Sequence, residues 1–220
     1  MKAFLFDLDG TLLDSMGVWA QIDHDFLKKR GFDVPDDYAR AVSRLSFPEA
    51  AKYTIERFRL EDTVDALCNE WSSMAVYAYG NTLPLKPYAK EYLLKLKECG
   101  VKLAIATSST KALYEPALIN HGIFDLFDAI CSTDEVGRGK TQPDIFYYTA
   151  ERLGALPSQC VLFEDIPEAV LSGKKAGMTV YGVYDEASKE HWEAMKEIAD
   201  GVLYDFQNAP LPAKQERKEA

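Results

Sequence analysis

Two aspartates near the start of the chain could hold a metal ion or carry out acid–base chemistry. Asp7 and Asp9 stand two residues apart at the end of an apolar run, residues 4–6. Because side chains alternate along a strand, both carboxylates can project to the same side if the extended backbone continues. Converging acids repel one another unless a cation lies between them, which favours a hard divalent ion such as Mg²⁺. The alternative is an ordinary Asp-Gly turn in which both acids are solvated.

Polar side chains also follow three later apolar runs. They are Thr107, Ser108 and Ser109 after residues 101–106, Lys140 after residues 128–131, and Glu164 and Asp165 after residues 160–163. Hydroxyl and N–H groups at a helix start can bind phosphoryl oxygens, and a lysine can offset the repulsion between a carboxylate and a phosphate. Each group also has an ordinary use, as a helix cap, a solvated loop lysine or acids favouring a helix N-terminus. Their order at four successive strand ends favours a shared metal and phosphate site.

Asp7 and Asp9 can divide the work of phosphoryl transfer between them. A carboxylate can attack phosphorus and form an aspartyl-phosphate, and Asp7, at the strand end, is best held for that task. Asp9 can protonate the leaving alkoxide and later deprotonate the attacking water. Asp165 completes the predicted Mg²⁺ ligands, with Glu164 as a further candidate.

The segments between the polar groups alternate between helical periodicity and short apolar runs. Strands are predicted at residues 101–106, 128–131, 160–163, 179–183 and 202–204, in addition to the first. This alternation predicts an α/β fold with a doubly wound, mostly parallel, Rossmann-like sheet and helices on both faces. Ligands of such sheets bind outside the carboxyl ends of the strands, where the polar groups would meet.

Residues 15–81 carry helical periodicity without a convincing strand. The first apolar stripe begins at Trp19, behind Asp14 and Ser15, which we expect to cap a helix. These helices are too apolar on one face to stand alone, so they predict a small bundle inserted after the first strand. The expected organisation is a catalytic core of residues 1–14 and 82–208, a helical cap domain of residues 15–81, and a tail of residues 209–220 that is mobile at its end.

Composition limits the classes of binding partner and the cellular compartment that we expect. A net charge of −10 and a pI of about 4.9 would repel nucleic acid and anionic lipid, so neither is expected as a partner. Cys68, Cys99, Cys131 and Cys160 are far apart and are expected to be reduced. Asp7 interrupts the N-terminal apolar run, which argues against a signal peptide. We expect a cytoplasmic monomer that acts on a small phosphorylated metabolite.

The motifs resemble those of the haloacid dehalogenase-like superfamily, in the branch with a helical cap domain after the first strand. Asp7-Leu8-Asp9-Gly10-Thr11 is similar to the first family motif, Thr107-Ser108 to the second, Lys140 to the third and Glu164-Asp165 to the fourth. The resemblance implies Asp7 as nucleophile and Asp9 as general acid and base. It implies that Thr107 and Lys140 bind phosphate. It also implies Mg²⁺ held by Asp7, the backbone carbonyl of Asp9, and Asp165.

The resemblance favours a phosphatase within that superfamily. In beta-phosphoglucomutase the first motif commonly ends in Val where this chain has Thr11, and a His stands where this chain has Trp19. Dehalogenases and phosphonatases lack the acid at the position of Asp9. We therefore predict a Mg²⁺-dependent phosphomonoester hydrolase, with a sugar-phosphate mutase as the alternative. A receiver-like phosphoacceptor is a further alternative, against which the long helical insertion and the place of the proposed nucleophile on the first strand stand. A non-catalytic binding protein is another, against which the intact acids at every expected place stand.

Overall fold

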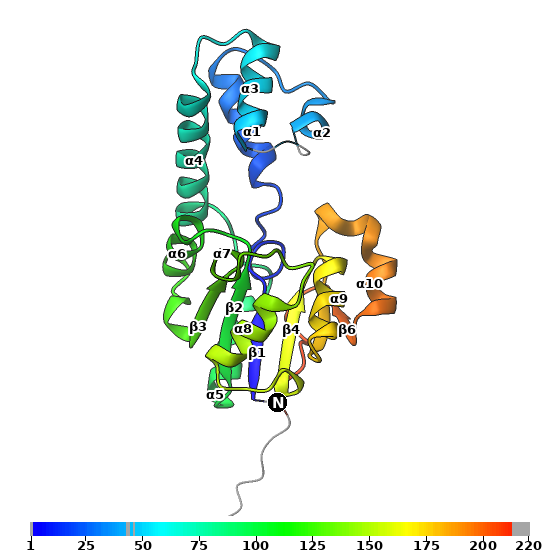
Figure 1. Ribbon diagram of the computed structural model, residues 1–220. Coiled ribbons are helices and arrows are strands. Elements are labelled where there is room, and N and C mark those ends of the chain that lie inside the picture. Colours follow the sequence, from blue (N-terminus) through cyan, green and yellow to red (C-terminus); the bar gives the residue numbers. More distant parts are fainter. Residues whose placement is uncertain (1, 43–44, 46, 213–220) are drawn as a thin grey trace, which may run out of the picture. The chain divides into compact units, whose positions relative to one another are not determined.

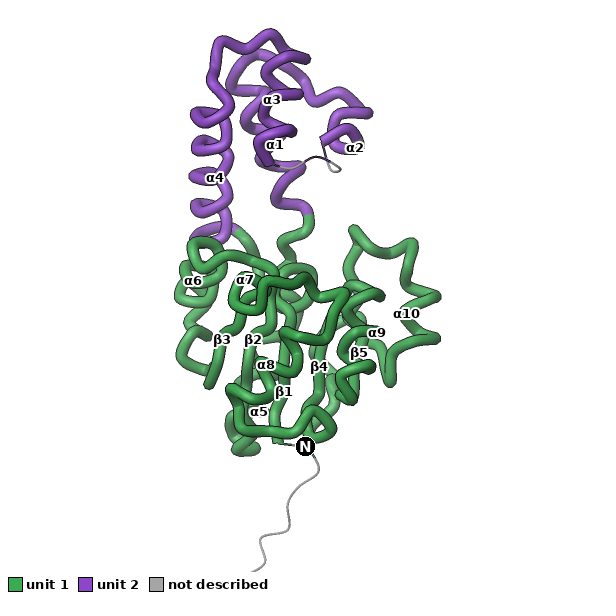
Figure 2. The backbone as a smooth tube through the Cα atoms, viewed as in Figure 1, with its two compact units in different colours: residues 1–16, 83–220 green, residues 17–82 purple. Residues whose placement is uncertain are grey.

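The computed structural model describes residues 2–42, 45 and 47–212. The chain divides into two compact units, one of residues 1–16 with 83–220 and one of residues 17–82 (Figure 2). We call the first the sheet unit and the second the helical unit. The end of the predicted tail, residues 213–220, lies outside the described residues.

The sheet unit is built on parallel strands in the order β3-β2-β1-β4-β5-β6 (Figure 1). In chain order these are β1 Ala3–Phe6, β2 Lys102–Thr107, β3 Ala129–Ser132, β4 Cys160–Glu164, β5 Thr179–Val183 and β6 Gly201–Leu203. The order runs outward from β1 in both directions, so the chain reverses its course across the sheet between β1 and β4. The predicted doubly wound α/β fold is confirmed.

Helices connect the strands of the sheet unit. They are α5 Ala89–Glu98, α6 Lys111–Asn120, α7 Thr133–Val136, α8 Asp144–Arg152, α9 Pro167–Lys175 and α10 Trp192–Ile198, with 3₁₀ turns at Phe124–Leu126, Pro157–Gln159 and Glu186–His191. The sequence pattern did not indicate α7. It is a single turn whose capping box joins Ser132 and Glu135, too short to show a periodicity.

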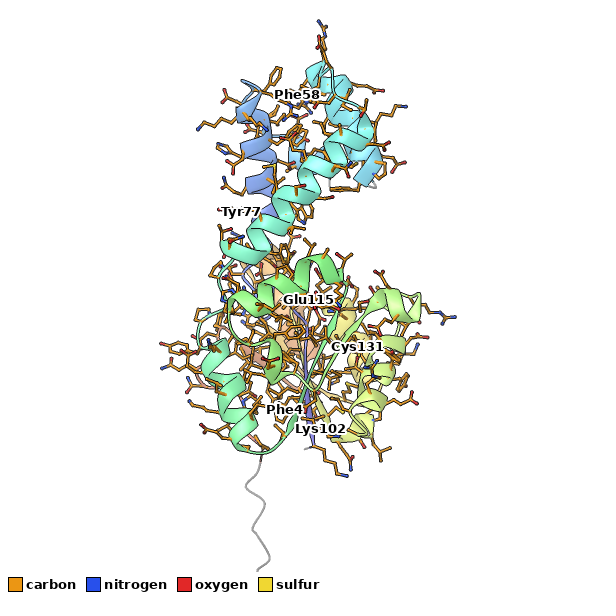
Figure 3. The ribbon with its side chains drawn as sticks, turned by 90° about the vertical axis from the view of Figure 1, so that its left-hand side faces the viewer. Phe4, Phe58, Tyr77, Lys102, Glu115 and Cys131 are labelled. Carbon is orange, nitrogen blue, oxygen red and sulfur yellow. The ribbon has the colours of Figure 1, made fainter. Side chains whose placement is uncertain are left out.

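Buried side chains cover both faces of β1. Leu5 packs into an apolar cluster with residues of α8, α9 and α10. Phe6 points to the other face, where its ring stacks on Phe163 of β4 with centroids 4.9 Å apart and contacts Tyr92 of α5 edge-on. Figure 3 shows Phe4 among the side chains that fill the same unit. Packing on both faces fixes the backbone of the strand that leads to Asp7.

The segment after β6 packs onto the sheet unit. Phe206 is buried, and its ring stacks on Tyr92. Ala209 is also buried, and the Tyr92 hydroxyl donates to the Pro210 carbonyl at 2.6 Å. The first residues of the predicted tail therefore take part in the packed structure.

The helical unit contains α1 Val18–Lys29, α2 Tyr38–Val42, α3 Phe47–Phe58 and α4 Val64–Asn81. The expected capping of the first helix by Asp14 and Ser15 is wrong, because α1 starts after Gly17 and has no side-chain cap. The Ser15 hydroxyl donates to Asp9 instead. Neither α4 nor any other helix in the described ranges is long and apolar enough to cross a bilayer.

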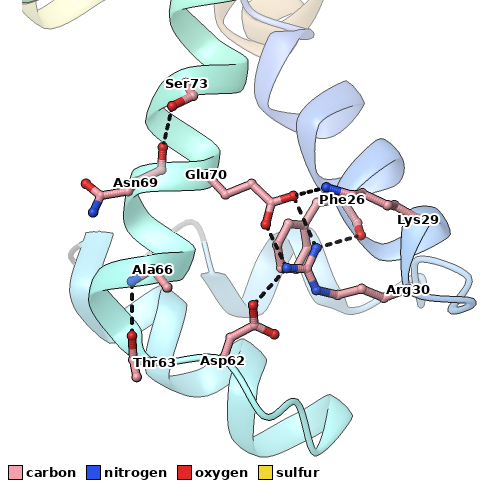
Figure 4. Close-up of polar contacts among 9 residues, drawn as sticks. All are labelled: Phe26, Lys29, Arg30, Asp62, Thr63, Ala66, Asn69, Glu70 and Ser73. Atoms are coloured by element: carbon pink, nitrogen blue, oxygen red, sulfur yellow. Dashed lines mark hydrogen bonds and ion pairs between the residues drawn. The ribbon is translucent and has the colours of Figure 1, made fainter.

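An ion network ties α1 to α4 (Figure 4). Arg30 donates to Asp62 at 2.9 Å and to Glu70 at 2.7 Å, and Lys29 donates to Glu70 at 2.8 Å. The Arg30 guanidinium also lies 3.8 Å from the centre of the Phe26 ring. Two cations and two acids therefore hold these helices together.

Candidate active site

The end of β1 positions Asp7. Phe6 is paired with Ile105 of β2 and with Phe163 of β4, and the Asp7 N–H donates to the Phe163 carbonyl at 2.9 Å. The hydrogen-bond ladder thus continues one residue past the strand. Asp7 is only 4% exposed, so its carboxyl group is held in a fixed, largely dry place at the switch point of the sheet.

Lys140 reaches Asp7 from the loop between α7 and α8. Its ammonium contacts Asp7 Oδ1 and donates to Glu164 Oε2 at 2.9 Å. The other oxygen of Glu164 accepts the backbone N–H groups of Asp165 and Ile166, at 3.1 and 3.2 Å. Glu164 therefore joins the lysine to the turn that carries Asp165.

Asp165 completes a group of three carboxyl side chains. Asp7, Glu164 and Asp165 can each offer an oxygen, and these oxygens lie within 4.8 Å of one another. Thr11 donates to Asp165 Oδ1 at 3.1 Å, whereas Oδ2 is buried without a hydrogen-bond partner. A buried carboxylate oxygen without a partner is costly, and a cation would relieve that cost. Because all the donors are oxygens, the group suits Mg²⁺ better than a softer metal.

The charges of this group are unbalanced. Burial and the charge of Glu164 raise the pKa of Asp7 to about 6, although Lys140 opposes the rise. Burial, followed by the charges of Glu164 and Asp7, raises the pKa of Asp165 well above its usual value. Burial alone would lower the pKa of Lys140, but Asp7 and Glu164 raise it, so the lysine stays charged. One ammonium faces three carboxyl groups, an excess that a divalent cation would balance.

Gly10 lets the loop after β1 lie against Asp165. Its φ is +83°, and a Cβ at this position would come within 2.4 Å of Asp165 Oδ2. Glycine meets both demands, since it has no Cβ and adopts positive φ without strain. The Asp-Gly pair signalled a turn in the sequence, but the close approach to Asp165 had no local signal.

The Asp9 side chain does not join the three carboxyl groups. Its Oδ1 accepts a hydrogen bond of 2.7 Å from the hydroxyl of Ser15, which is buried. Sequence reasoning missed this contact because a serine just before a helical pattern resembles a cap. The expected metal contact of Asp9 involves its backbone carbonyl and stays a prediction.

Thr107 ends β2 beside β1. It is fully buried, and its Oγ accepts the Ser109 N–H at 2.9 Å, in a turn that leads into α6. Ser109 is buried and Ser108 is exposed. Within the described residues, no hydrogen bond joins these three to Asp7 or Lys140, so their role as phosphate ligands stays a prediction.

Known proteins share this arrangement of sequence and fold. A sequence profile of haloacid dehalogenase-like hydrolases matches residues 1–177. Validoxylamine A 7'-phosphate phosphatase of Streptomyces hygroscopicus subsp. limoneus is 32% identical over 221 residues, covering 96% of this chain and 97% of that protein. A probable pseudouridine-5'-phosphatase of Drosophila melanogaster is 31% identical over 187 residues, covering 82% and 80%.

A solved structure shows the same fold. The putative beta-phosphoglucomutase from Thermotoga maritima superposes with a TM-score of 0.81 at 24% identity, covering 92% of this chain and 94% of that one. The family resemblance predicted from the motifs is confirmed by the profile match and by the two relatives. The chain belongs to the haloacid dehalogenase-like hydrolase family.

Proposed function

We propose that this chain is a Mg²⁺-dependent phosphomonoester hydrolase that acts on a small phosphorylated metabolite through an aspartyl-phosphate. The observation that carries the proposal is a buried Asp7 in contact with Lys140, beside Asp165 with its unpartnered oxygen. The relatives named phosphatases support the reaction type.

In the first step a carboxylate oxygen of Asp7 attacks phosphorus, and the bond from phosphorus to the leaving oxygen breaks. The leaving oxygen keeps the electron pair and takes a proton from the Asp9 carboxyl group. Lys140 offsets the repulsion between the phosphate and Asp7. Thr107 and the N–H groups of its turn bind phosphoryl oxygens at the start of α6.

In the second step water attacks the phosphorus of the aspartyl-phosphate. The Asp9 carboxylate takes a proton from that water, and the bond between phosphorus and the Asp7 oxygen breaks. Inorganic phosphate leaves, Asp7 is again a carboxylate, and Asp9 is again protonated for the next cycle.

Asp7, Asp165 and the backbone carbonyl of Asp9 would hold Mg²⁺, with Glu164 close by. The bound ion supplies positive charge that neutralises the phosphate and the clustered carboxylates. The buried Oδ2 of Asp165 supports this assignment, because no other group in the described residues satisfies it.

The helical unit is proposed as a cap domain that selects the substrate. In this assignment the cap domain spans residues 15–81, the catalytic core residues 1–14 and 82–208, and the tail residues 209–220. Trp19 and Phe47 are 42% and 37% exposed and lie edge to face, 5.7 Å apart. Phe47 also packs against Trp71, but the exposed parts of the two rings would suit a partly apolar or ring-shaped leaving group.

The test is phosphate release from a panel of sugar phosphates, polyol phosphates and nucleotides in the presence of Mg²⁺. We expect turnover of at least one class, lost in Asp7→Asn and retained in the surface control Asp200→Asn. Folded protein that releases phosphate from none of them, or an Asp7→Asn variant with wild-type turnover, contradicts the proposal. Conversion of beta-glucose 1-phosphate to the 6-phosphate, with a bisphosphate activator, would instead identify a mutase.

A further inference from the structure

Lys86 and Asp185 form a buried ion pair that is separate from the cluster of Asp7, Glu164 and Asp165. The Lys86 ammonium donates to Asp185 Oδ2 at 2.6 Å and to the Tyr184 carbonyl at 3.3 Å. Asp185 Oδ1 accepts the Ala187 N–H at 2.8 Å, so both carboxylate oxygens are used. Lys86 is 8% exposed and Asp185 is 2% exposed. A second acid, the exposed Asp14, lies 3.9 Å from the Lys86 ammonium. Loss of the lysine charge would leave Asp185 buried without its cation, and loss of the Asp185 charge would leave Lys86 only this longer, solvent-screened pair, so the Lys86–Asp185 pair holds both segments in one arrangement.

The backbone around Lys86 is bonded to the loop that follows β1. Residues 83–87, here called the return segment, lead the chain back into the sheet unit. The Lys86 N–H donates to the Leu12 carbonyl at 2.8 Å, and the Asp14 N–H donates to the Pro84 carbonyl at 3.0 Å. An isolated antiparallel bridge lies between these two bonds. The return segment therefore runs alongside residues 12–14.

Leu12 and Leu13 close the turn that carries Asp9. Both of their N–H groups donate to the Leu8 carbonyl, at 2.9 and 2.8 Å, and the Gly10 N–H donates to the Leu13 carbonyl at 2.9 Å. These bonds make residues 8–13 one compact unit. A shift of Leu12 is therefore transmitted to Asp9.

We propose that the Lys86–Asp185 ion pair is a positioning device for Asp9. The pair fixes the return segment to the loop after β5, and the return segment fixes the turn from which Asp9 reaches the leaving group. The inference rests on the proposed function, in which Asp9 supplies the proton to the leaving oxygen. Asp7 is held by the β1–β4 ladder instead, so loss of the pair impairs proton transfer more than nucleophilic attack.

The chain offers a matched control pair. Lys174 donates to Asp200 Oδ1 at 2.8 Å, and the other oxygen of Asp200 accepts the Val180 N–H at 2.9 Å. Here too one carboxylate oxygen accepts the lysine and the other a backbone N–H, but both side chains are 37% exposed and, in the described residues, no hydrogen bond joins them to the Asp9 turn. It separates the general effect of losing a Lys–Asp pair from the specific effect on Asp9.

The test compares kcat/KM for two substrates, because this ratio reports the steps up to phosphoryl transfer onto Asp7. The leaving group of p-nitrophenyl phosphate departs without a proton, whereas an alkyl phosphate needs one from Asp9. We expect Lys86→Met and Asp185→Asn to lower kcat/KM about 10²-fold for the alkyl phosphate and less than about tenfold for p-nitrophenyl phosphate. Lys86→Arg should recover part of the loss. Lys174→Met and Asp200→Asn should leave the kcat/KM for the alkyl phosphate, divided by that for p-nitrophenyl phosphate, at its wild-type value.

The inference is overturned if kcat/KM falls equally for the two substrates. It is also overturned if the quotient of the two kcat/KM values stays at its wild-type value in both Lys86→Met and Asp185→Asn. Circular dichroism and thermal unfolding first establish that each variant is folded at the assay temperature. If Lys86→Met does not fold, the nearly isosteric Asp185→Asn decides, because it keeps an acceptor for the Ala187 N–H. A wild-type protein that hydrolyses neither substrate overturns the proposed function, and this inference with it.

Discussion

Two charged clusters in the molecule balance their charges differently. In the helical unit, Lys29 and Arg30 face Asp62 and Glu70, so cations and acids are equal in number (Figure 4). At the carboxyl end of the sheet, one ammonium, that of Lys140, faces three carboxyl groups. The first cluster is complete as it stands, whereas the second has an excess of negative charge.

The acids of the two clusters respond in opposite directions. Hydrogen bonds from Arg30 lower the pKa of Glu70 to about 2, so this acid is stabilised in its charged form. Burial and the charge of Glu164 raise the pKa of Asp7 to about 6, so the charged form of this acid is destabilised. The helical cluster therefore stabilises the fold, whereas the sheet cluster keeps an excess of negative charge, as the proposed binding of a cation and a phosphate requires.

A large loss of turnover is expected from Lys140→Met. This variant removes the one cation of the sheet cluster, so kcat should fall by about 10²–10³, the usual cost of losing one electrostatic contact to a transferring group. Steady-state phosphate release measures the loss, with Lys174→Met as a surface control that keeps full activity. A Lys140→Met variant whose kcat is within about threefold of the wild-type value would contradict the role proposed for Lys140.

Removal of divalent ions should affect the sheet cluster alone. A chelator should abolish turnover, and Mg²⁺ should restore it. Free Mg²⁺ at one hundred times its Kd should also stabilise the fold by about 2.7 kcal/mol, a rise in Tm of roughly 5–10 °C. The Tm response should vanish in Asp165→Asn and persist in Glu70→Gln. A Tm that does not change with Mg²⁺ would show that the sheet cluster needs no cation.

A purely structural effect is expected from Arg30→Met. The variant leaves Glu70 and Asp62 without their shared partner and should lower the free energy of unfolding by about 1–3 kcal/mol. Urea denaturation measures this, and turnover per folded molecule should not change. Lys196→Met, which breaks an exposed pair with Glu193, should cost less than about 0.5 kcal/mol. A large loss of turnover in Arg30→Met would contradict the division of roles.

A small, pH-dependent effect is expected from Asp23→Asn, which tests whether a raised pKa alone marks a functional site. Burial raises the pKa of this half-buried carboxyl of α1 to about 6. An acid with a raised folded-state pKa destabilises the protein progressively as pH rises from about 4 to about 6. Asp23→Asn should therefore match wild type near pH 4 and be more stable by about 1 kcal/mol at pH 7. A stability difference that does not change with pH would contradict the assignment.

Regular packing made much of the sheet unit predictable. The run before Asp7 and the run before Glu164 are buried on both faces, so their apolar character marks the strands, and parallel topology brings their ends together. Contacts between distant loops left no such signal. Lys86 and Asp185 are 99 residues apart, and nothing near either residue indicates the other. The start of the first helix near Gly17 was predictable, but nothing near Ser15 indicates that its hydroxyl donates to Asp9 instead of capping that helix.

The most direct test of the central claim is to trap the covalent intermediate. The enzyme is quenched in acid during turnover, treated with borohydride, which reduces an aspartyl-phosphate to homoserine, and digested for mass spectrometry. The proposed function predicts homoserine at position 7 in the presence of substrate and Mg²⁺, and none without substrate. Steady phosphate release with no homoserine at position 7, or with homoserine at another aspartate, would contradict the role of Asp7.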